Sequence, residues 1–269
     1  MTLQHTRPPA VAGSFYPFAA DELRRDVESY LGAVQPVPDG DPLPKAVIVP
    51  HAGYVYSGPI AAAAYARAAA LKGVVERVVL LGPAHRVRLR GIALPAATRF
   101  STPLGVVDID QDAVAAISGL PQVIASDEAH ALEHSLEVQL PFLQTVLGTF
   151  KLVPLAVGDT PPEQVAQVLD LLWGGNETLI VISSDLSHYL PYPNACAKDE
   201  FTAETILRLQ PRLDHQQACG ATPINGLLIA ARARRLEPRL LDLRNSGDTA
   251  GDKSRVVGYA SFCFNDRKN

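Results

Sequence analysis

The stretch KAVIVPHAGY, residues 45–54, decides the fold, because a buried strand in it runs directly into a tight polar turn. The strand predicted at 45–50 is apolar throughout after Lys45, which is typical of a strand covered on both faces. Further strands are predicted at 77–82, 151–157, 178–184 and 256–264, with shorter ones at 91–94 and 239–243. Helices are predicted at 20–33, 58–71, 135–147, 162–173, 196–209 and 223–235. This alternation predicts an α/β fold of three layers, with helices on both faces of a mostly parallel sheet.

The bulk composition limits the class of protein. The chain has 269 residues, of which 47% are hydrophobic, so we expect one domain spanning 1–269. A net charge of -4 excludes a basic face for nucleic acid or for an anionic membrane. The three cysteines lack CxxC spacing, and no apolar run approaches the ~20 residues that span a bilayer. We therefore expect a cytoplasmic protein that binds neither nucleic acid nor membrane.

Three of the predicted strands lead into a histidine. His51 follows the strand at 45–50, His85 follows 77–82 in GPAH, and His188 follows 178–184 in SSDLSH. In open parallel sheets, ligands bind beyond the carboxyl ends of the strands. One such histidine is most often a structural residue, but three at equivalent ends predict a shared site.

A fourth polar segment is EHSLEVQLPF, residues 133–142, at the start of a predicted helix. A charged imidazole is unfavourable there, so His134 is better placed as a neutral hydrogen-bond partner, proton shuttle or ligand. Glu133 has an ordinary explanation as a partner of the helix dipole. His5 and His130 are expected to be solvated, and His215 receives no role. Of the cysteines, Cys219 alone lies in a turn that can reach the rim of the sheet.

Two imidazoles and one carboxylate form the ligand set that suits ferrous iron with open coordination positions. His51 and His85 supply the imidazoles. Candidates for the carboxylate are Asp185, Glu137, Asp248 and Asp252, the last two in the polar loop 245–254. The residues alone leave this choice open.

Several motifs in order give the chain a family resemblance. They are VAGSFYP (11–17), PHAGYVYSGP (50–59), GPAH (82–85), EHSLEVQLPFL (133–143), SSDLSHY (183–189), the Cys219-Gly220 turn, SGD (246–248) and VVGYA (256–260). Together they resemble the Memo family, whose bacterial branch is called AmmeMemoRadiSam system protein B. That family is similar in fold and pocket layout to the class III extradiol ring-cleaving dioxygenases.

The resemblance implies that His51 and His85 are metal ligands, with His134 and His188 lining the pocket. The animal branch carries a cysteine where this chain has Ser246-Gly247-Asp248, so the resemblance implies Asp248 as the third ligand. With that carboxylate we expect Fe(II), whereas copper or zinc are the alternatives. We expect His188 to act as acid and base, oriented by Asp185, with His134 and Glu137 completing the catalytic group.

Two classes of function follow. The first is a dioxygenase-like oxidoreductase that uses non-haem iron and acts on an unknown small molecule, such as a chelating diol. The second is a non-catalytic metal- or peptide-binding scaffold that works with a radical-SAM protein and an AMMECR-type protein, as the family name implies. Hydrolysis is a weaker hypothesis. Nucleophilic hydrolysis would use Ser184, Asp185 and His188, but the sequence has no GxSxG motif around the serine. Zinc-dependent hydrolysis would use the same histidines as the iron site.

Overall fold

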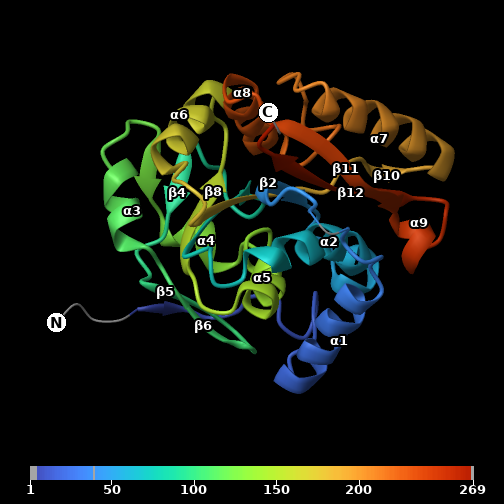
Figure 1. Cartoon of the computed structure of the whole chain (residues 1–269), viewed down its shortest axis with the longest axis horizontal. Helices are drawn as coiled ribbons and strands as arrows, with labels where there is room; N and C mark the ends of the chain where they lie inside the picture. Colours follow the sequence, from blue (N-terminus) through green and yellow to red (C-terminus); the bar gives the residue numbers. More distant parts are fainter. Residues whose placement is uncertain (1–4, 39, 268–269) are drawn as a thin grey trace.

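The computed structural model describes residues 5–38 and 40–267 (Figure 1). Its elements, with η denoting a 3₁₀ helix, are β1 (Thr6–Arg7), α1 (Ala20–Gly32), β2 (Pro44–Val49), α2 (Tyr54–Ala68), η1 (Ala69–Leu71), β3 (Arg77–Pro83), β4 (Ile92–Leu94), β5 (Arg99–Thr102), β6 (Gly105–Asp108), α3 (Gln111–Ile117), β7 (Val123–Ala125), α4 (Asp127–Ala131), η2 (Glu137–Gln139), α5 (Leu140–Leu147), β8 (Lys151–Val157), α6 (Pro162–Leu172), β9 (Thr178–Ser183), β10 (His188–Leu190), α7 (Tyr192–Leu207), α8 (Ala221–Ala233), β11 (Glu237–Asn245), α9 (Ser246–Thr249) and β12 (Val256–Asn265).

A nine-stranded sheet organises the molecule, in the order β10-β12-β2-β9-β3-β8-β4-β7, with β11 paired to β12. The four central strands β2, β9, β3 and β8 are parallel, and so is the β4–β7 pair. The strands β10, β11 and β12 at one edge and β4 at the other pair in antiparallel fashion. The predicted α/β class is therefore confirmed, with parallel pairing concentrated where the predicted histidine site lies.

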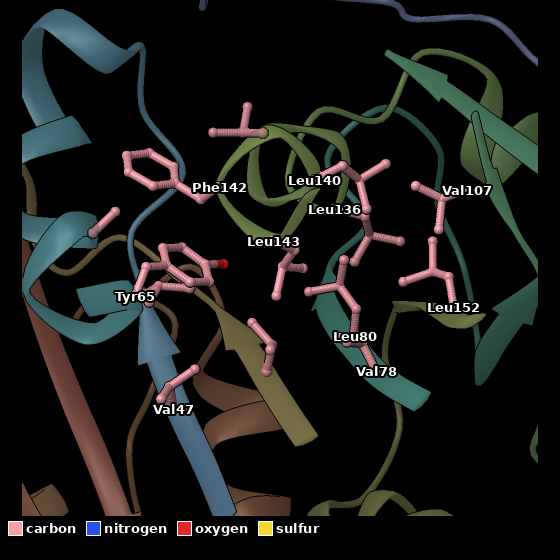
Figure 2. Close-up of a cluster of buried hydrophobic side chains, with 14 of the residues drawn as sticks. Val47, Tyr65, Val78, Leu80, Val107, Leu136, Leu140, Phe142, Leu143 and Leu152 are labelled. Carbon is pink, nitrogen blue, oxygen red and sulfur yellow. The ribbon is translucent and has the colours of Figure 1, made fainter. Parts of the chain in front are cut away.

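The central strands are covered on both faces because alternate side chains point to opposite sides. Val47, Val49, Val78 and Leu80 pack against α1, α2 and α5, and Figure 2 shows part of this cluster with Tyr65 and Phe142. Their sequence neighbours Ala46, Ile48, Val79 and Leu81 pack instead against α3, α6, α7 and α8. Figure 1 shows these two helical layers on opposite sides of the sheet.

Four helix starts differ from the sequence prediction, and the smallest difference is at α8, which begins at Ala221 rather than 223. The helix α2 begins at Tyr54 rather than 58, because the Tyr54 N–H donates to the carbonyl of Phe15 (2.8 Å), a contact between distant segments. The helix α7 begins at Tyr192 rather than 196, since a proline is tolerated in a first turn. The predicted helix at 135–147 opens as a 3₁₀ turn at Glu137 before becoming α5.

Several short elements carry too little apolar periodicity to be predicted. Strands β1, β5 and β6 form a separate three-stranded sheet, and α9 is a single helical turn inside the loop expected at 245–254. No helix in the described ranges is long and apolar enough to cross a membrane.

His130 corrects one sequence expectation. We predicted a solvated side chain, but His130 is 1% exposed. Its Nε2 donates to the carbonyl of Ala93 (2.9 Å) in β4, and its ring lies edge-on to Phe100. Burial lowers the pKa of His130 to about 4, so the imidazole is neutral in the folded protein.

This buried imidazole makes stability depend on pH. Between about pH 6.5 and pH 4 the His130 imidazole is protonated in the unfolded protein but not in the folded protein. The free energy of unfolding therefore falls as the pH falls. We expect the wild type to lose about 2 kcal/mol more unfolding free energy than His130→Gln between pH 7 and pH 5. Urea denaturation at both values measures this difference, and parallel pH profiles for the two proteins would contradict it.

Candidate metal centre

Three histidines meet at the carboxyl edge of the parallel strands. His51 follows β2, His85 follows β3, and His134 lies in the loop between α4 and η2. The ring centroids are 5.2 Å apart for His51 and His85, 5.4 Å for His51 and His134, and 4.8 Å for His85 and His134. The structure thus brings together the two predicted metal ligands and one predicted pocket residue.

The loop that carries His134 reaches the sheet because of a glycine in β3. A Cβ on Gly82 would lie 2.7 Å from the Ser135 hydroxyl oxygen, too close for any other residue. The Ser135 hydroxyl instead donates to the carbonyl of Pro83 (2.9 Å). Close packing at the GPAH motif therefore places His134 beside His85.

The hydrogen bonds of His51 fix which of its nitrogens is free. The Ser183 hydroxyl donates its single proton to the Ser135 carbonyl (2.6 Å), so it accepts from the His51 Nδ1, 2.9 Å away. Gln139 also donates to this hydroxyl oxygen (2.8 Å). Burial holds the pKa of His51 well below its usual value, so the ring is neutral. Its Nε2 therefore keeps a lone pair.

Glu133 orients the other two histidines. Its carboxylate accepts the backbone N–H groups of His85 (2.5 Å), His134 (2.9 Å) and Ser135 (2.9 Å), and also the Nδ1–H of His85 (2.9 Å). Burial acts to raise the pKa of Glu133, but the hydrogen bonds from His85 and Ser135 outweigh it and lower the pKa to about 2. The ionised carboxylate leaves the His85 Nε2 free, as in histidines that bind metals.

His134 completes the group with a nitrogen that has no hydrogen-bond partner among the described residues. Its Nδ1 is buried, and the nearest carboxylate oxygen, from Glu133, is 3.4 Å away. Burial lowers the pKa of His134 to about 4. One potential ligand atom from each of the three histidines lies within 4.8 Å of the other two, so the group could hold a metal ion.

Cys219 lies directly beside this group. Its Sγ is 3.3 Å from the Nε2 of His51. A Cβ on Gly220 would lie 2.7 Å from the Cβ of Ser184, so glycine permits this close approach to the end of β9. Burial raises the pKa of Cys219 to about 12, so the thiol keeps its proton and faces the free lone pair of His51.

Asp185 and His188 lie at the same cavity but are not bonded to each other. The Asp185 carboxylate accepts the backbone N–H of His51 (2.7 Å), and burial raises its pKa to about 6. His188 donates from Nδ1 to the carbonyl of Leu186 (2.8 Å). The expected orientation of His188 by Asp185 is therefore replaced by a backbone contact.

Glu137, which we placed in the catalytic group, faces away from the cavity. Both of its oxygens hold the N-terminal segment: they accept from the Arg7 guanidinium, the Tyr16 hydroxyl and the backbone N–H groups of Ala10 (2.7 Å) and Val11 (3.0 Å). The residue is fully buried. Its carboxylate is committed to structure rather than to a ligand.

Asp248, the expected third metal ligand, also lies elsewhere. Its carboxylate accepts from the Tyr192 hydroxyl (2.7 Å) and the backbone N–H of Asn245 (3.0 Å), where it caps α9. Asp252 accepts from the backbone N–H of Ser254 (2.7 Å). Both acids are thus bonded away from the histidines, and the group that could hold a metal ion includes His134 where a carboxylate was predicted.

The weaker hydrolytic reading needs contacts that the described residues do not make. The Ser184 hydroxyl donates to the carbonyl of Asp185 (2.8 Å) and accepts from the N–H of Gly220 (2.8 Å). It has no hydrogen bond to His188, whose Nδ1 is bonded to Leu186. Ser184 is thus a turn residue.

A cavity of about 680 Å³ opens onto the histidines. His51, His85, His134, Asp185 and His188 all line it, and the ring of Phe15 lies 4.8 Å from that of His134. Sequence reasoning left two residues of this region, Glu133 and Cys219, without a committed role. The signal for Glu133 was its position directly before His134.

Fold and site together define a mixed α/β protein with a three-histidine group that could hold a metal ion at the carboxyl edge of its parallel strands. The sequence profile described as "Memo-like protein" matches residues 7–263. The chain therefore belongs to the Memo family, which confirms the resemblance seen in its motifs.

Relatives at the sequence level extend over nearly the whole chain. A MEMO1 family protein of Sulfolobus acidocaldarius is 38% identical over 283 residues, covering 97% of this chain and 99% of its own length. Another from Aquifex aeolicus is 38% identical over 270 residues, covering 96% and 98%. Among solved structures, an uncharacterized protein, JW3007, from Escherichia coli K12 is similar in fold, with a TM-score of 0.53 at 16% identity, covering 80% of this chain and 98% of that one.

The buried pair of Arg7 and Glu137 gives a stability prediction. Glu137→Gln leaves the Arg7 guanidinium buried without its counter-charge, so we expect the free energy of unfolding to fall by about 3 kcal/mol or more. Urea denaturation at pH 7 measures it. The matched control is Glu204→Gln, which removes an exposed pair with Arg208 and should change stability by under about 0.5 kcal/mol. Equal stability of the two variants would contradict the structural role of Glu137.

Proposed function

We propose that this protein binds a first-row transition metal ion through His51, His85 and His134 and uses it on a small molecule in the adjoining cavity. One observation carries the proposal: three imidazoles each offer a nitrogen within 4.8 Å of the other two. Neutral imidazole is a ligand for zinc, copper, iron and nickel.

The donor set fits such an ion closely. Three nitrogens bound to one ion at about 2.1 Å are roughly 3.4–3.6 Å from one another, so side-chain movements of under about 1 Å close the group. Hydrogen bonds from His51 to Ser183 and from His85 to Glu133 hold these rings in the tautomer that leaves Nε2 free. The thiol of Cys219 is near enough to His51 to join the set after losing its proton.

A bound divalent ion supplies Lewis-acid chemistry by polarising an oxygen of the molecule in the cavity. The protein supplies the proton acceptor. His188 uses its Nδ1–H on the Leu186 carbonyl, which leaves Nε2 able to take a proton from a hydroxyl group in the cavity. Asp185 braces the backbone of His51 and so keeps the ring in place.

The metal and the reaction are narrower proposals. The resemblance to extradiol dioxygenases supports Fe(II) and ring cleavage of a chelating diol. The neighbouring thiol of Cys219 favours a softer ion, copper or zinc. The alternative function is a metal- or peptide-binding scaffold that works with a radical-SAM protein and an AMMECR-type protein, in which the histidines bind an ion without turnover.

Metal analysis tests the site. Protein purified without oxygen should bind about one Fe(II), Cu or Zn ion per chain, and His51→Ala, His85→Ala and His134→Ala should each lower metal affinity at least about 100-fold, because each removes a ligand. Metal content by mass spectrometry and competition with a chelator measure this. Circular dichroism verifies that each variant is folded.

Two further variants sharpen the result. Glu133→Gln keeps the three rings but weakens the acceptor of the His85 proton, so metal affinity should fall by about 10- to 100-fold. Asp248→Asn should bind metal like the wild type, because Asp248 is bonded to Tyr192. Loss of metal in Asp248→Asn, with retention in His134→Ala, would restore the carboxylate ligand set and overturn the three-histidine assignment.

Turnover separates the enzyme from the scaffold. Under oxygen, the Fe(II)-loaded protein should cleave a catechol ring, and His188→Gln should lower kcat at least about 100-fold because the proton acceptor is lost. Absorbance of the ring-opened product measures the rate. Full metal occupancy without turnover on a panel of catechols would favour the scaffold.

A further inference from the structure

The charges around the histidine cavity indicate what kind of molecule it accepts, an inference that rests on the proposed function. Two arginines, Arg86 and Arg255, line this cavity. Both are exposed, whereas His51 at the other end is 2% exposed, so the arginines lie at the mouth.

Arg86 directly follows His85 in the loop after β3. It has no ion pair with any carboxylate in the described part of the chain. Its side chain lines the same cavity as His85 and His134, which places its charge near the histidines. Arg86 also lines a second cavity of about 1240 Å³, together with Arg88 and Arg90.

Arg255 comes from the segment before β12. Its guanidinium lies 5.2 Å from the centre of the Tyr189 ring and likewise has no ion pair among described residues. Tyr189 has a φ of 58°, a left-handed conformation that costs a side-chain-bearing residue about 1–2 kcal/mol. Pairing of His188 with Val257 holds the backbone there. The fold thus keeps Tyr189 under Arg255 at the mouth.

The acids that line this cavity are already engaged. Asp185 accepts the backbone N–H of His51, and Asp252 accepts from the backbone and hydroxyl of Ser254. These are the two carboxylates that line the cavity within the ranges described. Within the described ranges neither arginine forms an ion pair with these carboxylates, so both guanidinium groups can bind an anion in the cavity.

We propose that Arg86 and Arg255 form an anion site at the mouth of the histidine cavity, and that the substrate is a small organic molecule with a carboxylate or phosphate group. The guanidinium groups bind its anionic end by charge-assisted hydrogen bonds. Its apolar body packs on Phe15, Tyr56 and Tyr259, which line the same cavity, and its far end reaches the histidines.

The test uses benzoate and phenyl phosphate as anionic probes and benzyl alcohol as the uncharged control. Affinity is measured by calorimetric titration at low salt, with metal-free and with Zn-loaded full-length protein. At least one anion should bind the wild type, with benzyl alcohol at least about tenfold weaker. The tighter anion identifies the head group as carboxylate or phosphate.

Arginine variants assign the site. Arg86→Gln and Arg255→Gln should each weaken binding of the anion at least about tenfold, since each removes a charged hydrogen-bond donor. Arg88→Gln is the matched control: it lies on the same loop but lines only the second cavity, so affinity should stay within about twofold. Absence of anion binding, equal binding of benzyl alcohol, or an equal loss in Arg88→Gln would overturn the proposal.

Metal content is measured on the same samples. Arg86→Gln and Arg255→Gln should retain the ion while losing the anion, because neither residue belongs to the histidine group. If the wild type binds the anion but no metal, the anion site is supported and the metal proposal is contradicted. If the wild type binds metal but neither anion, the metal proposal is supported and the anion site is contradicted.

Discussion

The site depends on the buried carboxylate of Glu133. It gathers the backbone N–H groups of His85, His134 and Ser135 and the ring proton of His85, so a single side chain joins the end of β3 to the loop before η2. A buried charge is costly unless it is fully hydrogen-bonded, and these four donors satisfy it. The contacts that stabilise Glu133 therefore also hold two of the three imidazoles together.

A second buried charge ties the N-terminal segment to the same loop. Arg7 donates to the Glu137 carboxylate and to the backbone carbonyls of His130 and Glu133. Tyr16 reaches the same carboxylate. The segment before α1 thus packs against the loop that carries His134, and the ring of Phe15 packs against that of His134. Phe15 therefore gives the cavity a wall that is distant in sequence from His51, His85 and His134.

The sequence allowed the scaffold to be predicted because β2, β3, β8 and β9 are continuous apolar runs, whose burial on both faces follows from composition alone. It also predicted that His51 and His85 lie together, since both follow such strands. His134 rather than Asp248 lies in the group that could hold a metal ion, for a reason no local pattern shows. Gly82 admits Ser135 against β3, whereas Asp248 is bonded to Asn245 and Tyr192. Tertiary contacts of this kind decide among residues whose local sequence signals are equal.

The histidine group connects the metal proposal to the arginines. Three imidazoles bring no negative charge to an ion, so a divalent ion bound among them would keep its full charge, whereas a carboxylate ligand would offset part of it. The carboxylates of Glu133 and Asp185 lie nearby, but both accept N–H groups of the protein, and neither belongs to the histidine group. Arg86 and Arg255 line the same cavity and add positive charge to it. A bound ion and the two guanidinium groups together would attract an anion more strongly than an uncharged molecule. The histidine group and the two arginines therefore favour the same kind of substrate.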